Sequence, residues 1–203
     1  MTDQNSARED IAFMRALAEE GRNAPFVGGP VMLAAGLCFG SASLAVWLNL
    51  SFRLVTSPWS FMGAWVLGLV AFVVVLVARK ASSGGRRGPS RAIGVAWSGA
   101  GWSIFFVALS LAVMAVRGKD AYVANAFLPF ILAIYGSAWF VAAGMTRARW
   151  LYAVAAGSFA FALVTAWFAS EGVVVFLVYA LGLYALVAAP GYVLTRLASR
   201  ASA

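Results

Sequence analysis

Histidine is absent from the 203-residue sequence, and cysteine occurs once, at Cys38. Without histidine, the chain lacks the side chain that most often binds zinc, iron and haem and that most often acts as a general base. A single cysteine cannot form an intrachain disulfide or a CxxC redox pair. Because Cys38 lies in an apolar segment, we interpret it as a small buried side chain. We therefore expect no catalytic residues, no metal site and no bound cofactor.

Charged residues are also scarce, at 11% of the chain against about 25% in soluble domains. Hydrophobic residues make up 63%, against roughly 45–50%. A water-soluble domain of this length could not bury so much apolar surface, because its ratio of surface to volume is too high. The composition disfavours a soluble enzyme, a disordered chain and a nucleic-acid-binding domain, and it indicates an integral membrane protein. The net charge of +8 then points to topology and contact with anionic lipid headgroups, not to nucleic acid.

Six apolar segments account for most of the chain, and none of them contains Asp, Glu, Lys or Arg. Each has 20–25 residues, close to the roughly 20 that an α-helix needs to cross a bilayer. Backbone groups in lipid must be satisfied internally, which favours helices. We predict an all-α polytopic membrane protein, with six transmembrane helices in one bundle over residues 26–48, 59–78, 92–116, 122–145, 150–169 and 173–194.

The first 25 residues have a different pattern. Ser6 and Glu9 fit a capping box, and Gly21 is a natural stop, which predicts a helix between them. Its apolar side chains fall on one face and its arginines and most of its acidic residues on the other, as in a helix that lies along a membrane surface. We therefore divide the chain into a cytoplasmic segment with an amphipathic interfacial helix (1–25), a six-helix transmembrane domain (26–194) and a short cytoplasmic tail (195–203).

Basic residues are distributed unevenly between the two sides of the predicted bundle. The N-terminal segment, the second and fourth loops and the tail carry 12 of them, and the loops on the opposite side carry 3. The positive-inside rule then places both termini in the cytoplasm, and we expect the protein in a bacterial inner membrane. The candidate surface for anionic lipid, or for a cytoplasmic protein partner, consists of Arg8, Arg15, Glu19, Glu20, Arg22, Arg79, Lys80, Arg86, Arg87 and Arg91.

Asn125 and Pro129 are the strongest candidates for a ligand site within the membrane. Pro129 cannot donate to the carbonyl four residues earlier, so Asn125 would offer both a freed carbonyl and a side-chain amide. The alternative is a simple kink whose carbonyl is satisfied by a neighbouring group. Further pocket candidates, which could equally form interhelical hydrogen bonds, are Trp102, Tyr135, Tyr179 and Tyr184.

Gly36 and Gly40 form a GxxxG pattern in the first span. Such glycines allow a second helix to approach closely, either from another copy of the chain in a homo-oligomer or from a neighbouring span. In addition, residues 39–42 (Phe-Gly-Ser-Ala) resemble residues 135–138 (Tyr-Gly-Ser-Ala). This likeness raises the hypothesis of a three-plus-three duplication with inverted topology.

Two functions are compatible with these features. The first is a non-enzymatic regulatory or accessory membrane protein, which senses the membrane or a lipophilic ligand or sequesters a cytoplasmic partner. The second is a small carrier or channel subunit for an uncharged or lipophilic solute. Carboxylate-driven transport is disfavoured because the six spans contain no Asp or Glu.

Overall fold

The computed structural model describes residues 28–57, 59–82, 90–118, 125–146 and 148–201. Within these ranges the chain is almost entirely helical and has no strand, which confirms the all-α class. Six stretches are long and apolar enough to cross a membrane, as predicted. The predicted interfacial helix lies outside the described residues. The helices are α2 (Gly29–Phe52), α3 (Trp59–Ser82), α4 (Ser90–Gly118), α6 (Phe127–Met145), α7 (Trp150–Trp167), α8 (Val174–Leu183) and α9 (Ala189–Ala201).

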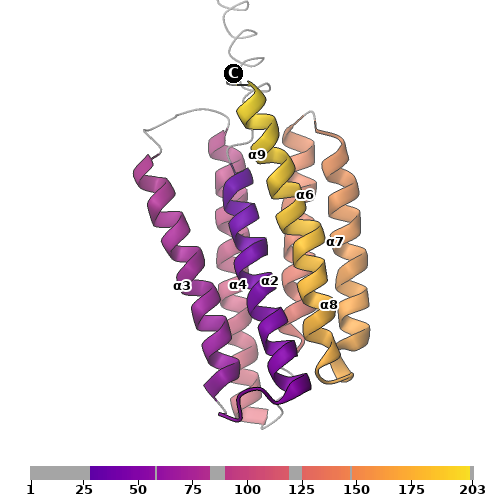
Figure 1. Cartoon of the computed structure of the whole chain (residues 1–203). Coiled ribbons are helices and arrows are strands. Elements are labelled where there is room, and N and C mark those ends of the chain that lie inside the picture. Colours follow the sequence, from indigo (N-terminus) through magenta and orange to yellow (C-terminus); the bar gives the residue numbers. More distant parts are fainter. Residues whose placement is uncertain (1–27, 58, 83–89, 119–124, 147, 202–203) are drawn as a thin grey trace, which may run out of the picture.

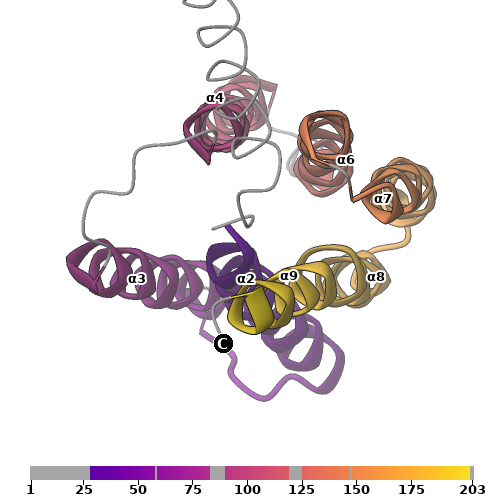
Figure 2. The same ribbon diagram turned by 90° about the horizontal axis from the view of Figure 1, so that it is seen from above.

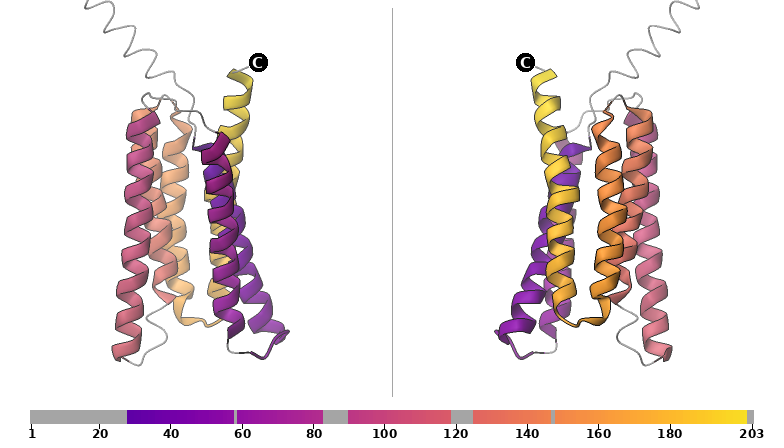
Figure 3. Two further views of the ribbon diagram at one scale, coloured as in Figure 1. Left: turned by 90° about the vertical axis from the view of Figure 1, so that its left-hand side faces the viewer. Right: turned by 90° about the vertical axis from the view of Figure 1, so that its right-hand side faces the viewer.

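The helices stand side by side in a horseshoe that runs in the order α3, α2, α8 with α9, α7, α6 and α4 (Figure 2). Two layers result, one of α3, α2 and the last span, and one of α4, α6 and α7 (Figure 3). Contacts of α8 with α7 and α6 join the layers along one edge. Because α3 packs chiefly on α2 and α4 chiefly on α6, the horseshoe is open between α3 and α4.

The core lies between the two layers and is built from large apolar and aromatic side chains. Leu132, Trp139, Tyr179 and Leu183 are almost fully buried there. The helix faces that point away from the core are also apolar. Leu67 on α3, for example, is 71% exposed. Helices that are apolar on all sides are expected where the surrounding medium is lipid.

Several predicted boundaries differ from the structure by a few residues; the first membrane helix, for example, ends at Phe52 instead of residue 48. The fourth membrane helix begins at Phe127 instead of residue 122. The last helix continues to Ala201, so most of the predicted tail (195–203) is helical and extends the sixth span. Six spans place the beginning of α2 and the end of α9 at the same end of the bundle (Figure 1).

Gly36 and Gly40 mediate a contact within the chain. A Cβ added at Gly36 would lie 2.8 Å from the Cα of Ala188, and one at Gly40 would lie 2.8 Å from the ring of Tyr184. Both partners belong to the last span, in the segment between α8 and α9. A buried hydrogen bond from Ser43 Oγ to the carbonyl of Phe176, at 2.8 Å, joins the same two spans. Of the two alternatives for the GxxxG pattern, the structure shows packing against a neighbouring span.

The last span contains one turn of π-helix, η2 (Tyr184–Ala188), between α8 and α9. Pro190, the second residue of α9, has no N–H to donate to the carbonyl of Leu186, four residues earlier. That carbonyl accepts a hydrogen bond from Trp139 Nε1 of α6, at 3.0 Å. The indole thus donates to a carbonyl that has lost its usual donor four residues on, and it ties the two layers together.

The inverted-duplication hypothesis does not agree with the arrangement of the helices. A two-fold axis in the membrane plane reverses the sense in which equivalent helices follow one another around the bundle. Spans one to three and spans four to six would therefore run around the bundle in opposite senses. In the structure both sets run in the same sense, with α4 beside α6 and α8 beside α2, so the likeness between residues 39–42 and 135–138 remains local.

Candidate functional site

The predicted kink at Pro129 is wrong. Pro129 is the third residue of α6, and the first N–H groups of a helix have no intrahelical partner in any case. A proline in this turn therefore breaks no helical hydrogen bond and fits the preferred geometry of a helix start. A kink was expected because the fourth helix was predicted to begin at residue 122, whereas α6 begins at Phe127.

Asn125 forms a connection at the end of the bundle instead of a site within the membrane. Its side-chain amide donates to the carbonyl of Ala169 at 3.1 Å. Ala169 lies in a short 3₁₀ turn, η1 (Phe168–Ser170), which follows α7. The hydrogen bond therefore holds the beginning of α6 to the end of α7.

Trp102 does not line the interior of the bundle. Its side chain is 63% exposed, and its ring neighbours are Phe105 and Phe106 of the same helix, at 6.0 and 6.1 Å. The prediction that Trp102 contributes to an interior pocket is therefore wrong. It lies on the outer face of α4, where its surroundings would be lipid.

Tyr135 and Tyr179 are the two predicted pocket residues that the structure brings together. They are 8% and 1% exposed, and both belong to the same buried core cluster. The ring of Trp97 lies 5.9 Å from Tyr135 and 4.8 Å from Trp139, and the ring of Trp65 lies 6.4 Å from Tyr179. We call these five residues the aromatic cluster. They fill space between the layers, which supports packing over a preformed pocket.

Trp97 carries the one buried side-chain nitrogen or oxygen atom that has no hydrogen-bond partner in the described part of the chain, its Nε1. An unpaired donor in an apolar interior costs free energy. The Trp97 and Trp139 rings meet edge to face, at an interplanar angle of 77°. This favourable aromatic contact partly offsets that cost.

Tyr184, the last predicted pocket residue, belongs to the contact between α2 and the last span. Its hydroxyl lies 3.0 Å from the hydroxyl of Ser41, and its ring covers Gly40. Its surroundings indicate a role in helix packing.

The candidate partner surface is described only in part. Arg79 is exposed near the end of α3. The side chains of Lys80 and Arg91 are not among the described ones, although both residues belong to helices. The remaining members lie outside the described residues: Arg8, Arg15, Glu19, Glu20, Arg22, Arg86 and Arg87.

The two ends of the bundle differ in charge. We call the end at which α2 begins and α9 ends the basic end (Figure 1). It carries four of the arginines whose side chains are described, namely Arg79, Arg149, Arg196 and Arg200. The opposite end carries two, Arg53 and Arg117, together with Glu171, the one acidic residue within the described ranges.

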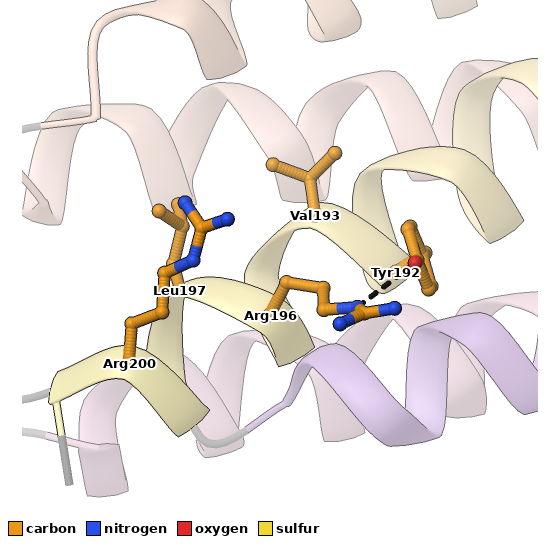
Figure 4. Close-up of a pocket in the computed structure, with 5 residues that line it drawn as sticks. All are labelled: Tyr192, Val193, Arg196, Leu197 and Arg200. Atoms are coloured by element: carbon orange, nitrogen blue, oxygen red, sulfur yellow. Dashed lines mark hydrogen bonds between the residues drawn. The ribbon is translucent and has the colours of Figure 1, made fainter. Parts of the chain in front are cut away.

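A surface depression of about 440 Å³ lies at the basic end, on the outer face of α9. The Nε of Arg196 donates to the hydroxyl of Tyr192 at 2.8 Å (Figure 4), and its guanidinium carbon lies 5.2 Å from the centre of the Tyr192 ring. This site was not predicted from the sequence. The signal that could have found it is the four-residue spacing of Tyr192, Arg196 and Arg200. The residues that line the depression are Tyr192, Val193, Arg196, Leu197 and Arg200.

Comparison with known proteins adds no relative: no protein-family model, no curated protein and no solved structure matches the chain.

Proposed function

We propose that this protein is a non-enzymatic regulatory or accessory protein of a bacterial inner membrane that binds a cytoplasmic protein partner at its basic end. The observation that carries the proposal is the charge difference between the ends, four arginines against two arginines and one glutamate among the described side chains. By the positive-inside rule, the basic end faces the cytoplasm. The sequence adds further positive charge to this end at Lys80, Arg86, Arg87 and Arg91.

The interior of the bundle supports this proposal over the alternative of a carrier or channel subunit. Among the side chains that the structure describes, three polar ones are buried: Ser43, Ser158 and Thr165. Each donates a hydrogen bond to a backbone carbonyl at 2.8 to 2.9 Å. The aromatic cluster fills the space between the layers. A carrier must open a path to each side of the membrane in turn, whereas a docking protein needs a stable scaffold with a charged end.

The experiment is a capture of soluble proteins on the full-length protein in lipid nanodiscs. The first variant replaces the five basic residues from Arg79 to Arg91 with glutamine, which removes the positive charge of this loop. The control, R53Q/R117Q, removes two positive charges from the opposite end. We expect a soluble protein that wild type and the control retain and the loop variant loses.

A captured protein is then purified and titrated against the same nanodiscs. Binding that depends on the basic end weakens as salt is raised, because salt screens exposed charges. If no soluble protein distinguishes the loop variant from the control, the regulatory proposal is wrong. Uptake of an uncharged solute by proteoliposomes in that case would favour the carrier alternative.

A further inference from the structure

The outer face of α9 combines two kinds of side chain in parallel columns. Tyr192, Arg196 and Arg200 follow one another at intervals of four residues, which places them on one side of the helix, and Val193 and Leu197 form a second column beside them. All five line the depression in Figure 4. We propose that this depression binds one anionic phospholipid, with its phosphate on the two arginines and part of an acyl chain on Val193 and Leu197. This inference does not depend on the proposed regulatory function.

The charge of the site suits a phosphate group. Arg196 uses its Nε–H in the hydrogen bond to Tyr192, which leaves the four N–H groups of its two terminal nitrogens for a ligand. Arg200 is exposed one helical turn further on. Among the described residues no carboxylate lies at this end, because Glu171 lies at the opposite one. Guanidinium groups bind phosphate oxygens through paired hydrogen bonds.

Tyr192 positions Arg196. The hydrogen bond to its hydroxyl, together with the contact between guanidinium and ring, holds the Arg196 side chain along the helix surface. An arginine held in this way loses less side-chain entropy when it binds a ligand.

The apolar part of the site, Val193 and Leu197, lies on the same outer side of α9 as the two arginines. Val193 and Leu197 are 42% and 48% exposed. The other side of α9 is occupied, because Leu194 is buried and Gly191 packs against the backbone of Leu33 in α2. The last turns of α9 extend beyond the neighbouring helices (Figure 1). That position suits arginines that reach headgroup level while their neighbours contact acyl chains.

A phospholipid fits these features better than a soluble anion. Free phosphate would use the two arginines and leave Val193 and Leu197 exposed. A phospholipid covers both columns at once, and its acyl chains reach the site from the surrounding bilayer.

The test is native mass spectrometry of the full-length protein in detergent, titrated with phosphatidylglycerol and, separately, with phosphatidylcholine. We expect the phosphatidylglycerol affinity to fall about fivefold in R196Q or R200Q and about 30-fold in the double variant. Y192F should lie between wild type and R196Q, since it removes the hydroxyl that accepts from Arg196 and keeps the ring contact. The control R53Q/R117Q removes the same amount of charge at the opposite end and should leave the affinity unchanged.

Two further ligands separate the possible sources of the phosphate. Inorganic phosphate and glycerol phosphate, both without acyl chains, should displace phosphatidylglycerol only poorly. If either binds as tightly as phosphatidylglycerol, the site takes a soluble anion and the lipid proposal is wrong. An equal loss of affinity in R53Q/R117Q, or no loss in R196Q/R200Q, would also overturn it. Thermal unfolding verifies that each variant is folded. If R196Q/R200Q does not fold, the phosphatidylglycerol affinity of R200Q alone tests the proposal.

Discussion

Replacing Gly36 with alanine adds a methyl group where α2 meets the backbone of the last span. That methyl carbon would lie 2.7 Å from the Cβ of Ala188 and 2.8 Å from its Cα. Two carbon atoms in favourable contact are about 3.5 to 4.0 Å apart, so the helices must separate by roughly 1 Å. The separation also strains the buried hydrogen bond from Ser43 to Phe176. Overpacking of this kind costs about 1 to 3 kcal/mol, and we expect G36A to lower the free energy of unfolding by that amount.

The matched control is G99A, on α4. A Cβ at Gly99 has no atom within 4 Å, and alanine is favoured over glycine within a helix by roughly 0.5 to 1 kcal/mol. We therefore expect G99A to be neutral or slightly stabilising. The assay is reversible unfolding in mixed detergent micelles, followed by circular dichroism. If G36A proves as stable as G99A, the proposed close packing between α2 and the last span is wrong.

Two further predictions concern hydrogen bonds between elements. W139F should lower the free energy of unfolding by about 1 to 3 kcal/mol, because it leaves the Leu186 carbonyl without a donor. The destabilisation by W139F should be smaller in a P190A background, where the N–H of alanine restores the helical hydrogen bond to Leu186. A double-mutant cycle measures this difference. Equal destabilisation in both backgrounds would contradict the explanation. N125A should cost about 1 kcal/mol through loss of the bond to Ala169, while P129A should change the thermal unfolding midpoint little, and a large effect of P129A would refute its placement in the first turn of α6.

Hydropathy was sufficient to predict the spans, because a bilayer permits few backbone arrangements other than helices. Which side of each helix faces lipid and which faces the interior of the bundle could not be predicted in the same way. Each span is apolar on all faces, so no polar stripe distinguishes the lipid-facing side from the interior. Trp102 illustrates this. Its depth along α4 was predictable, but its direction depends on which neighbours α4 has.

Long-range pairing was the second obstacle to prediction. Small residues one turn apart occur in several spans, so the sequence did not reveal that Gly36 meets Ala188. The orphan carbonyl of Leu186 follows from Pro190 by the rule that was applied to Pro129. Its donor, Trp139, lies 47 residues away on another helix and becomes evident only from the packing of α6 on the last span.

The proposed docking function requires that the basic end, with Arg149, Arg196 and Arg200, faces the cytoplasm. Alkaline phosphatase fused in live bacteria tests this orientation directly, because the enzyme is active only when it is exported. Fused after Arg200, at the end of α9, it should be inactive. Fused after Arg117, at the opposite end of the bundle, it should be active. Activity after Arg200 together with inactivity after Arg117 would contradict the orientation and the cytoplasmic docking function that follows from it.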